Sequence, residues 1–316
     1  MDEDTIQTRL ERRLGAVHAR QRLGIEADHE AQCFGQGLNF MHIENWYSVH
    51  SVIRTTLRLC GLYRRGCRNA GGIRLRRNTI RIEGLPAAFD GFTLLHLSDL
   101  HADMSGPAMA RVAEILPGLT YDLCVLTGDY RGKTFGPFDA AITGVAQVLE
   151  RISGPVYGVL GNHDTIQMVP DLEDLGVRVL LNEAVPLRRE NARLHLAGID
   201  DAHFFRVDNI EKAAAAIPAG ETAILLSHTP EIYRQAAHAG FSVLLSGHTH
   251  GGQICLPGGY PITLDSDLPR RYGAGAWRYG AMSGYTSVGA GSSVVAVRLN
   301  CPPEITLHRL ERAAAQ

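Results

Sequence analysis

The chain has 316 residues, of which 45% are apolar, and its formal net charge at pH 7 is −2. A globular chain of this length buries about 75% of the surface that its unfolded state exposes, which is enough for one large domain and a smaller appendage. The nearly neutral charge argues against a nucleic-acid-binding protein that works through overall basicity.

The cysteines and the first residues bear on localisation. The six cysteines show no C-x-x-C spacing, and Cys124 lies inside an apolar run, which favours a reduced chain. No stretch reaches the roughly 18 uninterrupted apolar residues of a spanning helix, and the first residues are acidic where a secretory signal is basic. The pair Arg64-Arg65 precedes polar and basic residues, not the apolar stretch of an export signal. We therefore expect a cytoplasmic protein.

Residues 1–70 are predicted to form a helical extension ahead of a larger second domain. Residues 1–39 are charged and helix-prone, and apolar side chains recur at helical spacing from Ile6 to Val17. Residues 40–63 predict a basic amphipathic helix. Its apolar stripe consists of Ile43, Trp46, Val49, Ile53, Leu57 and Cys60. The second domain is then expected to span residues 71–316.

The segment from Asn45 to Ile82 contains nine arginines and no acidic residue. One interpretation is attraction to an anionic membrane surface, with the protein bound peripherally to the inner face of the membrane and Trp46 and Tyr47 at the interface. The other is a helix that docks on the second domain or on a second subunit, with its arginines solvated. Both remain open, because an amphipathic pattern is compatible with either. The sequence does not indicate the oligomeric state.

From residue 71 onward, strand and helix patterns alternate, which is typical of an α/β fold. Alternating apolar side chains over residues 73–82 predict strand structure with a turn at Arg77-Asn78. Helices are expected over residues 109–116, 138–152 and 208–217.

Each of five short apolar runs in this domain is followed by a residue that can bind a metal. The runs span residues 92–97, 123–127, 156–160, 223–226 and 242–245. The residues that follow them are, in the same order, Asp99 and His101, Asp129, Asn162 and His163, His228, and His248 and His250. Uninterrupted apolar runs predict strands that are covered on both faces. Because parallel strands deliver their carboxyl ends to one edge of a sheet, these side chains are expected to converge there.

The types of these residues suit a two-metal site. Asp99 and His101 are two positions apart, so in an extended segment they face the same side and can hold one cation. Asp129 can bridge two cations about 3.5 to 4 Å apart. Asn162 offers a neutral oxygen ligand, and His163 offers a proton donor or acceptor. Each signal alone is weak, since single strand-end histidines and Gly-Asp turns are usually structural, but the combination is specific.

The ordered motifs Asp-x-His, Gly-Asp, Gly-Asn-His-Asp, a single His and Gly-His-Thr-His run from Gly91 to Gly252 and resemble those of the calcineurin-like metallophosphoesterases. The resemblance implies an α/β fold of four layers, an α-β-β-α sandwich, with a two-metal centre at the strand ends. The first metal would be held by Asp99, His101, Asp129 and His250. The second would be held by Asp129, Asn162, His228 and His248. Such ligands suit two divalent metal ions, with manganese preferred over iron or zinc.

The same resemblance implies in-line hydrolysis of a phosphoester by a water that the metals activate, without a phosphoenzyme. His163 would be a catalytic residue that protonates the leaving oxygen or stabilises the developing charge, and Asn162 would contact both metal and phosphate. Asp164 has two interpretations, a residue that orients His163 and a local cap or turn residue.

A lipid is the expected substrate. Asp129 is followed by Tyr130 and Arg131 and not by the Asp-Arg of the protein-phosphatase branch, which argues against a phosphoprotein. Residues 198–201 and 300–305 resemble a bacterial branch that includes lipid-directed enzymes. The preferred reaction is phospholipase C-type cleavage of glycerophospholipids to diacylglycerol and a phosphorylated head group. The alternative is hydrolysis of UDP-2,3-diacylglucosamine, the pyrophosphatase step of lipid A synthesis.

Other classes of function are weighed against this one. A soluble phosphodiesterase is a further alternative, and a non-catalytic scaffold of the same fold is disfavoured by the complete ligand set. A nuclease would need a basic and aromatic surface near the metals, which the arginine segment could supply, so it remains a minor alternative although no nucleic-acid partner is expected. His203, with Phe204 and Phe205, would line a lipid-facing loop or, as we prefer, belong to a buried aromatic cluster.

Overall fold

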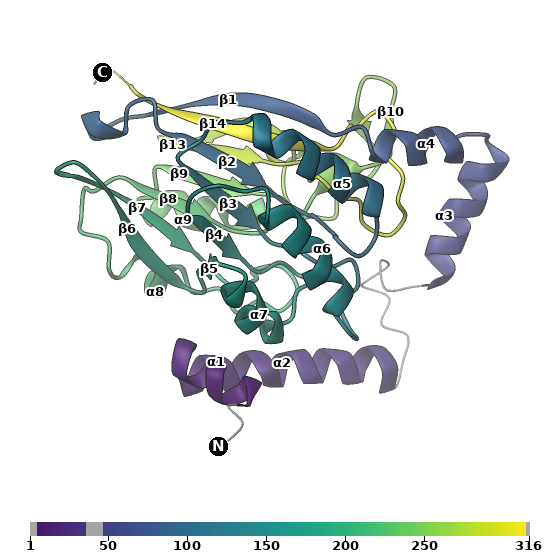
Figure 1. Cartoon of the computed structure of the whole chain (residues 1–316), viewed down its shortest axis with the longest axis horizontal. Helices are drawn as coiled ribbons and strands as arrows, with labels where there is room; N and C mark the ends of the chain where they lie inside the picture. The colour runs from purple at the N-terminus through teal and green to yellow at the C-terminus, as the bar shows by residue number, and fades with distance from the viewer. Residues whose placement is uncertain (1–4, 36–46, 314–316) are drawn as a thin grey trace.

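The computed structural model describes residues 5–35 and 47–313 (Figure 1). Two six-stranded sheets form its centre. The order in the first sheet is β1 (Arg74–Ile82), β14 (Glu304–Arg312), β2 (Thr93–Leu97), β3 (Leu123–Thr127), β4 (Val156–Val159) and β5 (Val177–Val179). The order in the second sheet is β12 (Gly275–Tyr279), β13 (Met282–Thr286), β9 (Val243–Ser246), β8 (Ala223–Leu226), β7 (Ala192–Gly198) and β6 (Glu183–Arg189).

The central strands of each sheet run parallel to one another. This holds for β2 to β5 in the first sheet and for β7, β8, β9 and β13 in the second. β14 runs antiparallel to β2, and β6 and β12 pair antiparallel at the two edges of the second sheet. The carboxyl ends of the parallel strands in each sheet therefore lie at a common edge.

The two sheets pack against each other, and helices cover their outer faces. Leu94 and Val125 of the first sheet and Leu226 and Leu245 of the second belong to one buried apolar cluster between the sheets. The outer face of the first sheet packs on α5 (Gly106–Ile115), α6 (Asp139–Leu149) and α7 (Val169–Asp174). The outer face of the second packs on α8 (Ile210–Ala214) and α9 (Tyr233–His238). The predicted four-layer α-β-β-α arrangement is confirmed.

Most predicted elements have counterparts in the structure. The five apolar runs correspond to β2, β3, β4, β8 and β9, and the three predicted helices correspond to α5, α6 and α8 with shifted ends. The remaining short elements are the strands β10 (Cys255–Leu256) and β11 (Tyr260–Pro261) and six 3-10 helices. These are η2 (Ala87–Phe89), η3 (Leu116–Gly118), η4 (Ile166–Met168), η5 (Pro230–Ile232), η6 (His250–Gly252) and η7 (Arg270–Tyr272).

The turn predicted at Arg77-Asn78 is wrong. β1 is one continuous edge strand that pairs in parallel with β14 over its whole length. The side-chain amide of Asn78 lies 3.1 Å from Nδ1 of His308 on that neighbouring strand. A local pattern does not reveal such a partner, because β14 comes from the carboxyl end of the described chain.

The first two helices pack on the catalytic domain. α1 (Ile6–Leu14) and α2 (Ala16–Gly35) lie along the lower edge of the molecule, beneath α7 (Figure 1). Leu10 and Ala19 are fully buried in the same cluster as α5 and α6. Ile6 and Val17 of the predicted stripe are exposed, and a break at Gly15, which has a φ of 87°, separates Val17 from α1.

The predicted amphipathic helix is described only in part, since residues 40–46 lie outside the described residues. It corresponds to α3 (Tyr47–Leu59), which is followed by α4 (Tyr63–Ala70). Leu57 is buried and Ile53 packs beside it, both against Val295, Val297 and Leu299 of the catalytic domain. Docking on the domain thus accounts for this part of the stripe, and the boundary at residue 71 stays a prediction. Among the described residues, every helix is too short or too polar to cross a bilayer.

Candidate metal centre

All seven predicted ligands converge at the carboxyl ends of the central strands. The first sheet supplies four of them, Asp99 and His101 after β2, Asp129 after β3 and Asn162 after β4. The second sheet supplies three, His228 after β8 and His248 and His250 after β9. Each of these residues is at most 6% exposed. The centre therefore lies at the junction of the two sheets.

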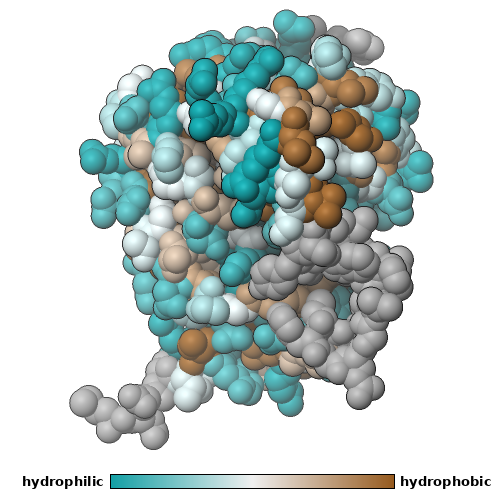
Figure 2. Space-filling model, turned by 90° about the vertical axis from the view of Figure 1, so that its right-hand side faces the viewer, coloured by the Kyte–Doolittle hydropathy of each residue, from teal (hydrophilic) through white to brown (hydrophobic). Residues whose placement is uncertain are grey.

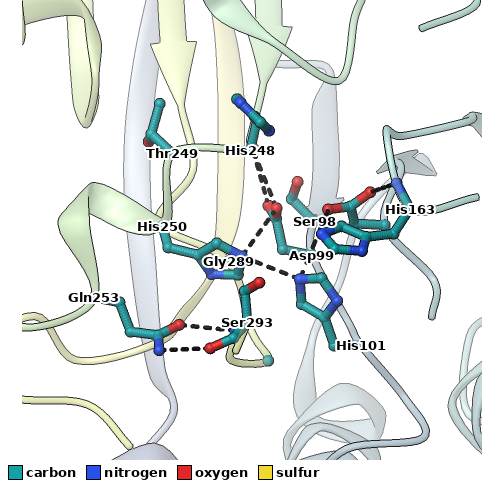
Figure 3. A network of polar contacts seen from close by, with 12 residues as sticks. Ser98, Asp99, His101, His163, His248, Thr249, His250, Gln253, Gly289 and Ser293 are labelled. Atoms are coloured by element: carbon teal, nitrogen blue, oxygen red, sulfur yellow. Dashed lines mark hydrogen bonds and ion pairs between the residues drawn. The ribbon is translucent and has the colours of Figure 1, made fainter. Parts of the chain in front are cut away.

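The ligands predicted for the first metal form one group. Nε2 of His250 lies 3.0 Å from Nε2 of His101 and 3.5 Å from Oδ1 of Asp99. Oδ2 of Asp129 lies 3.7 Å from Nε2 of His101. Figure 3 shows Asp99, His101 and His250 pointing toward one another.

The ligands predicted for the second metal form an adjacent group. Oδ1 of Asn162 lies 2.8 Å from Nε2 of His228 and 2.9 Å from Nδ1 of His248. Oδ2 of Asp129 lies 3.3 Å from Nε2 of His228. One oxygen of Asp129 thus faces both groups, which is the position that a bridging ligand needs.

The backbone at the ligands is held in an uncommon conformation. Five of the seven have a positive φ, namely 50° at Asp99, 40° at His101, 54° at Asp129, 70° at His248 and 49° at His250. Residues other than glycine adopt this left-handed conformation at a cost of about 1 to 3 kcal/mol each and do so mainly at functional sites. The fold thus stabilises a ligand arrangement that the local chain disfavours.

Two glycines leave the space that this arrangement requires. A Cβ at Gly161 would lie 2.2 Å from Oδ1 of Asp129, and a Cβ at Gly247 would lie 2.3 Å from Oδ2 of Asp99. Both contacts are shorter than any side chain allows. The glycine-framed motifs seen in the sequence therefore let the ligand loops approach one another closely.

Backbone carbonyls orient two of the ligand imidazoles. Nδ1 of His101 donates to the carbonyl of Arg131 at 2.8 Å, and Nδ1 of His228 donates to the carbonyl of Thr127 at 2.7 Å. Both rings therefore present Nε2 to the centre of the site. Metal-binding histidines are commonly held by such outer hydrogen bonds.

His250 is held differently. The fully buried Arg298 donates to the carbonyl of His250 at 3.0 Å and approaches its Nδ1 at 3.0 Å. Burial and the charge of Arg298 lower the pKa of His250 well below its ordinary value, so the ring is neutral. A guanidinium can only donate hydrogen bonds, so Nδ1 of His250 accepts one and the proton of the neutral ring resides on Nε2. A cation that binds Nε2 therefore has to displace this proton.

The electrostatics of the centre favour bound cations. Burial alone would raise the pKa of Asp129, but His228 and His163 outweigh it and hold the pKa well below the ordinary range. Burial would lower the pKa of His228, but the carboxylate of Asp129 raises it to about 10. A protonated His228 takes the place of a cation beside Asp129, so metal binding has to release this proton.

The donor set fits a pair of divalent metal ions. It comprises two aspartate carboxylates, four imidazoles and one amide oxygen, all within two contiguous groups. Nitrogen and oxygen ligands of this kind suit manganese, iron or zinc. The ligand chemistry alone does not choose among these metals.

His163 lies beside the centre but outside both ligand groups. Its Nε2 is 3.9 Å from Oδ2 of Asp129, and its Nδ1 is 3.1 Å from the hydroxyl of Thr134. Burial lowers the pKa of His163 to about 4, so the ring is neutral at pH 7. Its backbone N–H donates to Oδ1 of Asp129 at 3.0 Å, which fixes the ring next to the bridging carboxylate.

His203 is a neighbour of the site that the sequence did not assign to it. Its ring centroid lies 4.2 Å from that of His248, and its Nδ1 lies 3.0 Å from Oε2 of Glu231. With His248 and Asp265 it forms a third group of residues whose ligand atoms lie within 4.8 Å of one another. The two phenylalanines that follow His203 are buried, as the preferred interpretation predicted. The only signal in the sequence was a histidine beside that aromatic pair.

The part of the sequence that contains these ligands matches a known protein family. The family profile for calcineurin-like phosphoesterases matches residues 92–252, which include all seven ligands. The metallophosphoesterase YkoQ of Bacillus subtilis (strain 168) is 31% identical over 245 residues, covering 74% of this chain and 89% of YkoQ.

Two further relatives differ in length. The phosphodiesterase YaeI of Escherichia coli (strain K12) is 29% identical over 233 residues, covering 69% of this chain and 82% of YaeI. A transmembrane protein with a metallophosphoesterase domain from Danio rerio is 29% identical over 256 residues, covering 74% of this chain and 56% of that protein.

Proposed function

Because this chain belongs to the calcineurin-like phosphoesterase family, we propose that it is a metal-dependent phosphodiesterase that acts on a membrane lipid. The preferred reaction is phospholipase C-type cleavage of a glycerophospholipid. The observation that carries the phosphoesterase activity is the convergence of seven buried ligands around Asp129, with His163 beside them. The lipid substrate rests on a separate feature, the surface described below.

The chemistry that two bound divalent cations supply is polarisation of the phosphoryl oxygens and activation of a water. Asp129 would connect the two ligand groups, because its Oδ2 faces both of them. Its Oδ1 accepts a hydrogen bond from the backbone N–H of His163. Asn162 would contact the phosphate as well as a cation. The buried surroundings strengthen each of these interactions.

His163 would donate a proton to the leaving oxygen. When the hydroxyl of Thr134 donates to Nδ1, the proton of the neutral ring resides on Nε2. Nε2 is also the atom that faces the bridging carboxylate. The neutral ring can donate a hydrogen bond from Nε2 to the leaving oxygen, whereas full transfer of a proton from this position requires the imidazolium form, which the carboxylate of Asp129 favours.

The surface that supports a lipid substrate lies on the side of the molecule that carries α3, α4 and the β10–β11 hairpin. Leu256, Tyr260 and Ile262 of the hairpin segment are 51%, 55% and 54% exposed, and Val52 and Leu59 of α3 are 63% and 84% exposed. Figure 2 views this side and shows apolar side chains at its surface among polar ones. The hairpin begins five residues after the ligand His250. Exposed apolar groups next to a site favour an apolar partner.

Positive charge accompanies these apolar groups. Five exposed arginines lie in or next to α3 and α4, namely Arg54, Arg58, Arg64, Arg65 and Arg68. The guanidinium of Arg270 lies 4.6 Å from the ring centroid of Tyr260 in the hairpin segment. Arginines that flank apolar side chains favour an anionic lipid surface, such as the inner face of a bacterial membrane.

Mass spectrometry of reaction products tests the substrate. Manganese-loaded protein is incubated with mixed phospholipid vesicles and, separately, with UDP-2,3-diacylglucosamine. Diacylglycerol and a phosphorylated head group are expected from the vesicles. UMP and a lipid monosaccharide phosphate would instead identify the lipid A pyrophosphatase reaction. Hydrolysis of soluble phosphodiesters alone would refute a lipid substrate.

A vesicle-binding experiment tests the surface. The double variant Leu256→Ser/Ile262→Ser is expected to sediment less with anionic vesicles than the wild type, because it removes two exposed apolar groups from the hairpin segment. Val17→Ser is the matched control, since Val17 is 75% exposed on α2. Equal sedimentation of all three proteins would contradict the proposed surface.

A further inference from the structure

Two charged side chains of α2 are buried where a surface helix normally carries solvated ones. Arg22 is 0% exposed, and Glu26, one helical turn later, is 9% exposed. Nε of Arg22 lies 3.5 Å from Oε1 of Glu26 and 3.4 Å from Oδ1 of Asp200. The ion pairs therefore connect α2 with the loop that follows β7.

Glu26 contacts the loop that carries the catalytic histidine. Its Oε1 accepts from the backbone N–H of Ile166 at 2.7 Å, and its Oε2 accepts from the hydroxyl of Thr165. Thr165 and Ile166 lie two and three positions after His163 in the sequence. A single carboxylate of the N-terminal helix thus fixes the end of the Gly161–Ile166 segment, hereafter the catalytic loop.

Arg22 contacts two active-site loops at once. It donates to the carbonyl of Asp164 in the catalytic loop at 3.1 Å. Its guanidinium also lies 3.6 Å from the ring centroid of Phe205. Phe205 lies two residues after His203, whose ring contacts the ligand His248. The same side chain therefore links the catalytic loop with the His203 loop.

We propose that α2 is a positioning element of the active site, in which Arg22 and Glu26 set the placement of His163. Buried ion pairs contribute little net stability, because the desolvation of both charges offsets their attraction. Hydrogen bonds to fixed backbone groups, in contrast, restrict a loop to one geometry. A displacement of about 1 Å at a catalytic group can lower turnover about a hundredfold. The contacts of Glu26 are thus better suited to positioning than to stability.

The remaining contacts of the N-terminal helices anchor α2 for this role. Arg13 of α1 binds Glu173 at 2.9 Å and donates to the carbonyl of Val179 at 2.8 Å. Leu10 packs in the core of the catalytic domain. Both helices are therefore attached at several points to the domain that they position.

The inference rests on the phosphoesterase activity and not on the lipid substrate, so the test uses a soluble aryl phosphodiester and full-length, manganese-loaded protein. Glu26→Ala is expected to lower kcat on the order of tenfold or more, with KM and metal content within about twofold of the wild type. Glu26→Gln should restore most of kcat, because its amide oxygen still accepts from Ile166 and its NH₂ group meets the hydroxyl of Thr165. Glu30→Ala is the matched control, since Glu30 is exposed on the same helix.

A second variant and a second measurement keep the test decisive. Thr165→Val removes the same hydrogen bond from the loop side, so it should lower kcat in the same direction even where Glu26→Ala fails to fold. The backbone N–H of Ile166 should exchange faster with solvent in Glu26→Ala, a readout that does not depend on activity. Unchanged kcat in both variants, or a loss that follows metal content, would overturn the proposal. Absence of activity in the wild-type protein would instead refute the proposed function.

Discussion

Asp164 binds the backbone of Asp129 and so joins two of the three loops that carry ligands in the first sheet, those after β3 and β4. Its Oδ2 accepts from the N–H of Asp129 at 2.8 Å and from the N–H of Gly161 at 2.8 Å. Its Oδ1 accepts from the N–H of Tyr130 at 2.9 Å. Asp164 is therefore a cap that spans two loops, which is close to the second of its two interpretations from the sequence.

Asp164→Asn should weaken the metal centre. An asparagine keeps one acceptor oxygen but turns an NH₂ group toward backbone N–H donors, so at least one buried donor loses its partner, at a cost of about 1 to 3 kcal/mol. We expect lower thermal stability and lower manganese content, both measured on purified protein. Full metal content with wild-type stability would show that Asp164 does not hold the loops.

His163→Ala and Asp129→Asn should separate catalysis from metal binding. Loss of the general acid should lower kcat by about 10² to 10⁴-fold, while metal content stays near normal because His163 lies outside both ligand groups. Asp129→Asn should abolish turnover and reduce metal content, since it removes the charge that faces both groups. Metal analysis and steady-state kinetics of the two variants measure this difference. Loss of metals in His163→Ala would mean that His163 is itself a ligand.

The core and the ligand set could be predicted from the sequence because both depend on local signals. The five strands that precede ligands are short apolar runs, so the rule that parallel strands end at one edge was enough to bring Asp99 and Asp129 of the first sheet together. The meeting of these residues with His228 of the second sheet was implied only by the family resemblance. Strand structure over residues 73–82 was predicted correctly, but the continuity of β1 could not be predicted. Its partner β14 lies far along the chain, and the Arg77-Asn78 pair resembles a turn when its neighbours are unknown.

The role of the N-terminal helices could not be predicted from the sequence either. An arginine and a glutamate four positions apart on a charged helix normally indicate a solvated pair. Burial of Arg22 and Glu26 depends on Asp200, Thr165 and Ile166, which are far away in sequence. The sequence predicted a helical extension over residues 1–70 but gave no sign that α2 contacts the catalytic loop.

The ion pairs of Asp200 should make the free energy of unfolding depend on pH under acidic conditions. Burial would raise the pKa of Asp200, but Arg22 and His18 outweigh it and lower the pKa below the ordinary value. A carboxylate with a lowered pKa stabilises the fold fully above the pKa of the unfolded chain, about 3.9, and this stabilisation is lost as the pH falls through the lower folded value. Burial raises the pKa of Glu26, so a fall in pH that protonates Glu26 stabilises the fold instead.

Denaturant unfolding between pH 2 and pH 6 measures this dependence. The free energy of unfolding of the wild type should fall more steeply below pH 4 than that of Asp200→Asn, which has no carboxylate to protonate at this position. Asp200→Asn should also be less stable at pH 6, because Arg22 then loses a buried partner. Parallel pH profiles for the two proteins would contradict the assigned ion pair.

Gly161→Ala should disrupt the metal centre while the rest of the fold persists. The added Cβ would lie 2.2 Å from Oδ1 and 2.6 Å from the backbone nitrogen of Asp129, so the two ligand loops have to move apart. Overpacking of this kind costs about 1 to 3 kcal/mol. We expect strongly reduced manganese content with near-normal far-ultraviolet circular dichroism. Gly118→Ala is the control, because Gly118 lies ahead of β3 of the first sheet, has no positive φ, and a Cβ added there would have no neighbouring atom within 4 Å. If Gly161→Ala bound metal as well as this control, the close approach of the two loops would not be needed for the site.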